Sequence, residues 1–207
     1  MKCIGPSEVR DMIDLLLVLI SYLLGSIPSG FWFGKLFKHR DVRDVGTKST
    51  GAVNTFVFVG MLPGVLTLAV DMIKGALSVH LAHTFSHLPW LPMASLCACI
   101  LGHNYSIFMR FRGGKGLASL VGATLYIWYP GIFIIAFLII MAGILMKDFN
   151  VATGLGIFFM PPVLFLFDQQ WYYLVFGTMI ATLIMIKYRS AITGWFAKRH
   201  HPESQEE

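Results

Sequence analysis

The sequence has 207 residues, of which 56% are hydrophobic and 13% are charged, and its formal net charge is +5. A soluble domain carries about 25% charged residues, and the apolar residues here form long blocks rather than amphipathic stripes. This composition excludes an ordinary soluble domain and indicates an integral membrane protein. The length suits one compact bundle, so we expect a single membrane-embedded domain over residues 1–207, with a polar tail at 198–207.

The apolar blocks predict an all-α integral membrane protein, a bundle of seven spans with short and kinked helices. In chain order the predicted spans cover residues 12–37, 56–82, 91–108, 117–128, 132–146, 151–167 and 172–186. Pro28 should kink or break the first of them. Tyr129-Pro130-Gly131 predicts a tight turn between the fourth and fifth, with one long bent span as the alternative.

Lysine and arginine gather in alternate connections, after the first, third, fifth and seventh predicted spans. The positive-inside rule then places the N-terminus outside and the C-terminus in the cytoplasm. Because topology accounts for the positive charge, we do not expect nucleic-acid binding.

A glycine-rich motif, Arg112-Gly113-Gly114-Lys115-Gly116, lies between the third and fourth predicted spans. Glycines allow left-handed or crowded backbone conformations. Free N–H groups in the motif, the N-terminus of the following helix and the Lys115 ammonium together predict an anion site. The motif therefore suggests an enzyme that acts on phosphorylated, lipid-soluble substrates, and the alternative is a helix–helix turn that carries topogenic charges.

A second polar segment, residues 41–54, carries Arg43, Thr47, Lys48 and Asn54 among glycines. Hydroxyls, amides and cations in this arrangement suit the recognition of a phosphate or a polyol. The alternative is an ordinary solvated loop. The segment runs without a break into the second predicted span, and polar backbone at membrane depth is tolerated only inside protein or along a wet cavity.

Three ionisable residues lie within or at the end of predicted spans. Asp71 and Lys74 are spaced i,i+3 and can pair on one helical face, either as a structural ion pair or as part of a catalytic site. His103 ends the third span close to Lys115 and is either a base or a structural residue. We expect no metal, because His80, His83 and His87 share one helix face without a carboxylate or cysteine nearby.

Five blocks of the sequence, taken together, resemble the bacterial integral-membrane acyl-phosphate:glycerol-3-phosphate acyltransferases. The blocks cover residues 25–30, 41–54 with Gly60, 71–75, 102–108 and 111–116. The resemblance implies transfer of a fatty acyl group from acyl phosphate to the 1-hydroxyl of glycerol 3-phosphate, which yields lysophosphatidic acid and phosphate for phospholipid synthesis. It further implies no metal or coenzyme A, and a site on the cytoplasmic side of the bacterial plasma membrane. We expect a monomer whose partners are acyl phosphate, glycerol 3-phosphate and membrane lipid.

The resemblance and the residue chemistry together give a candidate site. Lys115 and the backbone around it would bind acyl phosphate and stabilise developing charge, and the segment around Thr47 would position glycerol 3-phosphate. The candidate catalytic residues are Lys115, His103 and Thr47. The candidate substrate-binding residues are Gly113, Gly114, Gly116, Arg112, Lys48, Asn54, Arg43, Asp71 and Lys74.

Several positions depart from the family pattern. Gly46-Thr47-Lys48-Ser49 stands where the family has Gly-Ser-Gly-Asn, and Val57 replaces an arginine. A serine, a histidine and an asparagine of the family are replaced by Ala152 (with Thr153 beside it as a substitute), Tyr188 and Ala191. The alternatives to the acyltransferase are therefore the same scaffold with another acceptor, or a non-catalytic lipid- or phosphate-binding membrane protein. The complete motif around Lys115 favours the acyltransferase.

Overall fold

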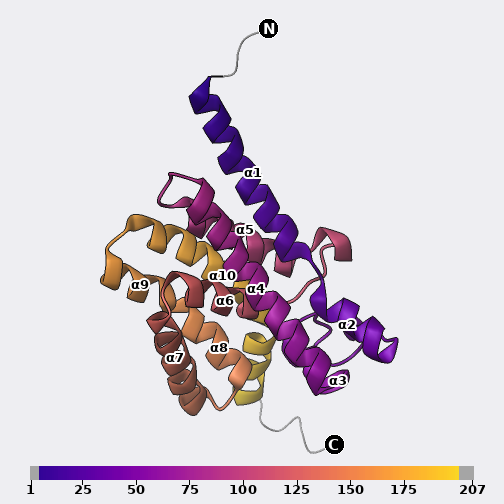
Figure 1. The fold of residues 1–207 in the computed structure, drawn as a ribbon. Helices are drawn as coiled ribbons and strands as arrows, with labels where there is room; N and C mark the ends of the chain where they lie inside the picture. Colours follow the sequence, from indigo (N-terminus) through magenta and orange to yellow (C-terminus); the bar gives the residue numbers. More distant parts are fainter. Residues whose placement is uncertain (1–4, 201–207) are drawn as a thin grey trace, which may run out of the picture. The chain divides into compact units, whose positions relative to one another are not determined.

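The computed structural model describes residues 5–200 and contains only helices and their connections within that range. The helices are α1 (Pro6–Ser26), α2 (Ser29–Lys38), η1 (Val42–Asp44), α3 (Ala52–Phe58), α4 (Met61–Phe85), α5 (Leu91–Asn104), η2 (Ile107–Met109), α6 (Leu117–Ile127), α7 (Pro130–Met146), α8 (Phe149–Phe158), α9 (Met160–Asp168) and α10 (Trp171–His200) (Figure 1).

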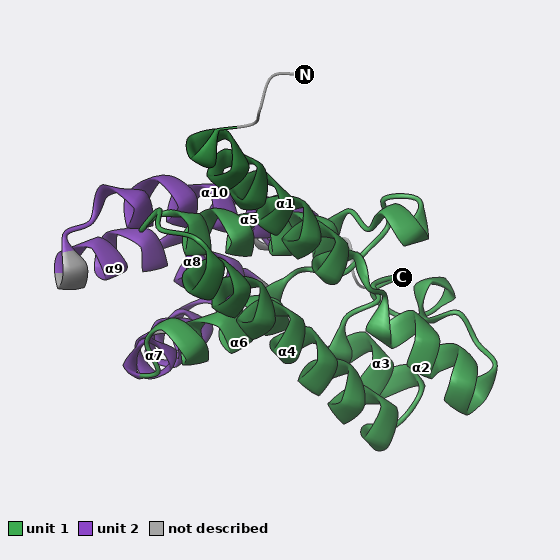
Figure 2. Cartoon of the chain, turned by 45° about the horizontal axis from the view of Figure 1, so that its top comes forward, with its two compact units in different colours: residues 1–129 green, residues 130–207 purple. Residues whose placement is uncertain are grey.

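The chain forms two compact units, residues 1–129 and residues 130–207 (Figure 2). In the first unit, α4 contacts α1, α2, α3, α5 and α6, so it forms the centre of that unit. In the second unit, α8 contacts α7 and α10, and α10 also contacts α9. The expectation of one domain over the whole chain stays a prediction.

Glycines bring the helices of the first unit into close contact. A Cβ on Gly25 would strike the backbone of α5, and a Cβ on Gly102 would strike the backbone of α1. Gly75 and Gly122 meet the backbones of α6 and α4 in the same way. Small residues let helices approach closely in a bilayer, where no hydrophobic force drives them together.

The first predicted span is interrupted at Pro28, as its sequence predicts. α1 ends at Ser26 and α2 begins at Ser29. Proline has no N–H to continue the helical hydrogen bonds, and its ring excludes the residue before it from helical geometry.

The second predicted span differs from the expectation, because it consists of two helices. α3 ends at Phe58, and α4 begins at Met61 after Gly60. Gly60 has φ +140°, a conformation that is essentially restricted to glycine. The polar loop therefore leads into a short separate helix, and the prediction of an unbroken run into the span was wrong.

The sixth and seventh predicted spans also need correction. The sixth is split at Phe159 into α8 and α9, because Pro161 and Pro162 favour a new helical start at Met160. The seventh was predicted to end at Ile186, but α10 continues to His200 as one helix. Residues 201–207 of the predicted polar tail lie outside the described residues.

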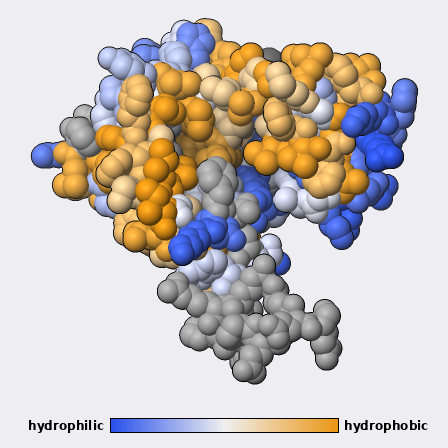
Figure 3. Space-filling model, turned by 90° about the horizontal axis from the view of Figure 1, so that it is seen from below, coloured by the Kyte–Doolittle hydropathy of each residue, from blue (hydrophilic) through white to orange (hydrophobic). Residues whose placement is uncertain are grey.

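Large apolar side chains cover much of the surface, and hydrophilic residues gather in patches (Figure 3). Within the described chain, four helical stretches are long and apolar enough to cross a bilayer: Pro6–Lys38, Met61–Phe85, Leu91–Met109 and Trp171–Ser190. Three shorter apolar helical stretches cover 117–127, 130–146 and 151–166. These properties confirm an all-α membrane protein, while seven crossings and the direction of the termini stay predictions.

Candidate functional site

The loop between α2 and α3 is organised by one buried amide, that of Asn54. Its Nδ2 donates to the carbonyl oxygens of Val42 (2.7 Å), Ser49 (2.9 Å) and Val45 (3.2 Å). Its Oδ1 accepts from the backbone N–H of Thr47 at 3.0 Å. Because both ends of the amide are engaged by the loop backbone, Asn54 shapes the loop in this structure and presents Thr47 at its surface.

The loop uses two left-handed residues around Thr47. Gly46 has φ +55°, and a Cβ there would strike the Phe58 ring and the Asn54 amide. Lys48 has φ +53° although it carries a side chain. Left-handed conformations of such residues cost about 1–3 kcal/mol and persist where the surroundings over-determine them. Thr47 and Lys48 are both exposed, so their side chains are available to a ligand.

Arg43 ties this loop to the connection that follows α5. Its guanidinium contacts both carboxylate oxygens of Asp41, with Nε at 3.0 Å and 3.1 Å from them. It also donates to the carbonyl oxygen of Met109 at 3.5 Å and lies 5.4 Å from the centroid of the Phe31 ring. The hydrogen bond from Arg43 lowers the pKa of Asp41 and raises the pKa of Arg43.

The glycine-rich loop packs against the C-terminal end of α5. The N–H groups of Gly113 and Gly114 donate to the carbonyl oxygens of Asn104 (3.2 Å) and His103 (3.0 Å). The last carbonyl groups of a helix lack intrahelical hydrogen-bond donors, and here the N–H groups of the loop are those donors. The prediction of free N–H groups was therefore wrong for these two glycines.

The glycines are required by this close approach. A Cβ on Gly113 would strike the carbonyl of His103, and a Cβ on Gly114 would strike the His103 imidazole. Gly116, with φ +81°, is the N-cap of α6. Lys115 is partly exposed at the start of α6 and Arg112 before it is exposed, so these two cations and the helix N-terminus are the groups of the motif that suit an anion.

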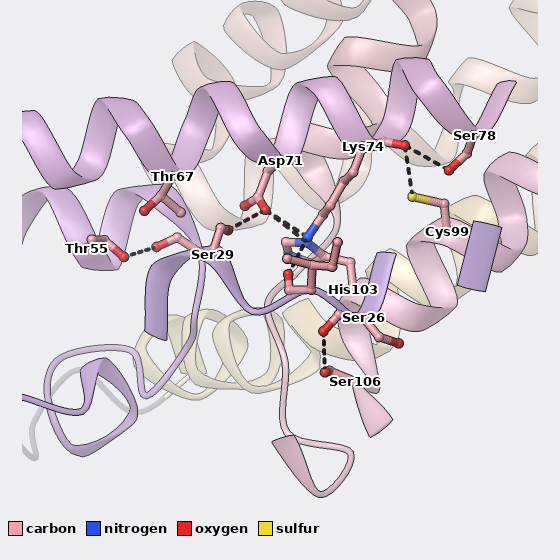
Figure 4. Close-up of polar contacts among 12 residues, drawn as sticks. Ser26, Ser29, Thr55, Thr67, Asp71, Lys74, Ser78, Cys99, His103 and Ser106 are labelled. Carbon is pink, nitrogen blue, oxygen red and sulfur yellow. Dashed lines mark hydrogen bonds and ion pairs between the residues drawn. The ribbon is translucent and has the colours of Figure 1, made fainter. Parts of the chain in front are cut away.

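A buried polar cluster lies behind this loop (Figure 4). Asp71 and Lys74 form the predicted ion pair, with Nζ 2.8 Å from Oδ1 and both side chains buried. Ser29 Oγ donates to the same carboxylate oxygen at 2.7 Å. His103 Nδ1 lies 3.8 Å from it, so the imidazole that touches Gly114 also faces Asp71.

The first unit thus gathers the predicted site residues in two connected layers. The outer layer consists of the two loops, joined by the bond from Arg43 to Met109. The inner layer consists of Asp71 and Lys74, joined to the glycine-rich loop through His103. Asp71 and Lys74 are fully enclosed, so the structure places them behind the candidate site rather than at its surface.

The positions that depart from the family pattern lie in both units. Val57 on α3 is 65% exposed. In the second unit, Ala152, Thr153 and Tyr188 are buried where α8 meets α10, since a Cβ on Gly154 would lie 3.7 Å from that of Tyr188. The side chain of Ala191 lies outside the described part.

Sequence reasoning missed the serines of the site. Ser29 contacts Asp71, and Ser106 Oγ donates to the carbonyl oxygen of Ser26 at 2.5 Å. The signal was the pair of serines that flank Pro28, where a broken helix leaves backbone groups that need partners. In the described part of the chain, no group of three histidine, cysteine or acidic residues could hold a metal ion.

Comparisons with known proteins agree with this geometry. The profile of the glycerol-3-phosphate acyltransferase family matches residues 15–198. A glycerol-3-phosphate acyltransferase of Streptococcus pyogenes serotype M5 is 34% identical over 198 residues, which cover 92% of each chain. Two crystal structures of PlsY (YgiH), an integral membrane glycerol 3-phosphate acyltransferase, are also similar. Its glycerol 3-phosphate form has TM-score 0.81 and 28% identity, and its lysophosphatidic acid form has 0.78 and 27%. Each covers 90% of this chain and 93% of its own. The chain belongs to the glycerol-3-phosphate acyltransferase family.

Proposed function

We propose that this protein transfers a fatty acyl group from acyl phosphate to the 1-hydroxyl of glycerol 3-phosphate and releases lysophosphatidic acid and inorganic phosphate. The observation that carries the proposal is the packing of loop 112–116 on His103, which leaves Lys115 partly exposed at the start of α6. Membership of the family supports the same acceptor and product.

In the proposed reaction, the 1-hydroxyl oxygen attacks the acyl carbon and forms the new ester bond. The bond between that carbon and the phosphate oxygen breaks, and the electron pair leaves with the phosphate. The hydroxyl proton passes to the departing phosphate, so the reaction needs no separate base. The Lys115 ammonium and the N-terminus of α6 stabilise the charge that develops.

We propose roles for the other predicted site residues on the basis of their exposure and contacts. Arg112 is exposed beside Lys115 and is proposed to share the acyl phosphate. Thr47 and Lys48 are proposed to hold glycerol 3-phosphate, on a loop that Asn54 and Arg43 keep in shape. His103 is proposed to act by holding Gly114, Gly113 and the start of α6 in position.

We further propose a monomeric single domain of seven spans, with the N-terminus outside and the site on the cytoplasmic side of the bacterial plasma membrane. The loops after the first and third predicted spans are both basic, and the bond from Arg43 to Met109 brings them together. Two basic loops on one side are typical of a cytoplasmic face.

The test is the release of inorganic phosphate from palmitoyl phosphate by the purified protein, with and without glycerol 3-phosphate. Release that needs the acceptor and is lost in Lys115→Ala supports the proposal. The matched control is Lys38→Ala, which removes an exposed lysine at the end of α2 and should have no effect.

Two results would contradict the proposed acyl transfer to glycerol 3-phosphate. Release that needs a different hydroxyl compound would identify the same scaffold with another acceptor. No release above that of Lys115→Ala, with acyl phosphate still bound, would identify a non-catalytic lipid-binding protein.

A further inference from the structure

The connection between α5 and the glycine-rich loop is a tight hairpin, residues 106–112. The backbone N–H groups of Met109 and Phe111 both donate to the carbonyl oxygen of Ser106, at 3.1 Å and 2.8 Å, and Arg112 donates to Met109 at 3.2 Å. Ser106 and Met109 are buried and hold the base of the hairpin. In Figure 1 the hairpin lies beside the end of α1, and η2 contacts α1.

The tip of the hairpin presents apolar side chains outward. Ile107 is 50% exposed, and Phe108 and Phe111 are each 60% exposed. Three large apolar side chains are thus exposed within one short loop. Such surfaces on proteins mark contact with a partner or a membrane.

The backbone of the hairpin is strained next to these exposed side chains. Arg110 and Phe111 are consecutive and both left-handed, with φ +53° and +62°. Each such residue costs about 1–3 kcal/mol and is kept where the surroundings impose it.

Charge and position identify what covers the tip. The stretch Leu91–Met109 is long and apolar enough to cross a bilayer and runs into the hairpin, so we expect the hairpin at the end of that crossing. Arg110 is exposed there, and Asp41, which reaches the base of the hairpin through Arg43 and Met109, is paired with Arg43. A cation beside apolar side chains at this level is complementary to an anionic lipid surface.

We propose that the hairpin 106–112 is a lipid-contact site. Ile107, Phe108 and Phe111 enter the boundary between head groups and acyl chains, and Arg110 binds the phosphate of an anionic phospholipid. The hairpin thereby holds loop 112–116 at the level of the lipid phosphates, where an acyl phosphate presents its head. This last consequence rests on the proposed function, and the lipid contact itself does not.

A depth measurement tests the contact without any need for turnover. The protein, with Cys3, Cys97 and Cys99 replaced by serine, carries a single NBD-labelled cysteine at position 108 in phosphatidylglycerol-containing vesicles. The control is Asp44→Cys, an exposed position on η1. We expect nitroxide lipids to quench the label at 108 strongly and aqueous iodide to quench it weakly, with the reverse at 44. Equal quenching by iodide at both positions would overturn the proposal.

A kinetic measurement tests whether the hairpin holds loop 112–116 at the level of the lipid phosphates. The double variant Ile107→Ser/Phe108→Ser leaves the strained pair intact and should raise KM for vesicle-borne palmitoyl phosphate about tenfold. KM for water-soluble butyryl phosphate should not change. The matched control Phe85→Ser removes a side chain that is 61% exposed at the far end of α4, and it should alter neither value. An equal rise for both donors would show a distorted active site and contradict the lipid role.

The head-group contact is tested with Arg110→Gln. This substitution should raise KM for palmitoyl phosphate about fivefold in vesicles that contain phosphatidylglycerol, and little in purely zwitterionic vesicles. The same rise in both lipids would contradict binding of an anionic head group. If no variant and no wild-type protein turns over either donor, the proposed function fails, and the depth measurement still decides the lipid contact.

Discussion

Lys74 on α4 donates a hydrogen bond from Nζ to the carbonyl oxygen of Ile27, 3.1 Å away, at the break between α1 and α2. The same ammonium lies 2.8 Å from Asp71, which accepts from Ser29 just beyond the break. Backbone groups freed at membrane depth need internal partners. The buried ion pair therefore supplies hydrogen-bond partners for the backbone and side-chain groups at the helix break that Pro28 causes.

We predict that Lys74→Met destabilises the protein by roughly 3–5 kcal/mol, because it leaves the Asp71 carboxylate buried without its counterion. The measurement is thermal unfolding in detergent. The double variant Asp71→Asn/Lys74→Met removes both charges and should be clearly more stable than the single variant. A single variant as stable as the wild type would show that the pair does not hold the break.

Much of this arrangement could be predicted from the sequence. The i,i+3 spacing of Asp71 and Lys74 is enough to predict their pairing, because helix geometry puts such residues on one face. Pro28 predicts the break by its chemistry alone. Hydrophobic blocks give the helices for a similar reason, since a bilayer demands long apolar segments.

The breaks at Gly60 and Phe159 were missed, because apolar residues continue across both and a hydropathy pattern joins them. Gly60 and Pro161-Pro162 were the available signals. The bonds of Gly113 and Gly114 could not be predicted, because they depend on which helix end lies beside the loop. That contact is tertiary, and no local pattern encodes it.

Gly114→Ala is expected to lower kcat/KM for acyl transfer about 10²-fold, the scale for losing a positioned stabilising group. The added methyl would collide with the His103 imidazole and displace the loop that carries Lys115. The control is Gly194→Ala on α10, where a Cβ would meet no heavy atom of the described chain within 4 Å. Initial rates of phosphate release compare the two variants. An unaffected Gly114→Ala enzyme would show that the packing of Gly114 on His103 does not position Lys115 for catalysis.

Asn54→Asp distinguishes shaping of the loop from binding of substrate. Aspartate keeps the acceptor for Thr47 but loses the donors to three carbonyls, and each buried unsatisfied group costs about 1–3 kcal/mol. We expect faster amide hydrogen exchange over residues 42–49 and a higher KM for glycerol 3-phosphate. A higher KM with unchanged exchange would instead show that Asn54 contacts the substrate directly.

The pair of Asp41 and Arg43 predicts a pH-dependent contribution to stability. Its hydrogen bond lowers the pKa of Asp41 below the ordinary 3.8. A carboxylate with a lowered pKa stabilises the folded state above its unfolded pKa, and the contribution is lost as pH falls through the folded value. Asp41→Asn should therefore cost about 0.2–1 kcal/mol at pH 7, because the pair is partly exposed.

This cost should shrink once the pH falls below 3.8, because the unfolded chain then takes up the proton at the ordinary pKa before the folded protein does. Thermal unfolding of both proteins between pH 7 and pH 3 measures the difference. Asp44→Asn is the matched control, since Asp44 is exposed on the same turn while the Arg43 guanidinium is paired with Asp41. A difference between wild type and Asp41→Asn that stays constant across the range would show that the carboxylate charge does not hold Arg43 over Met109.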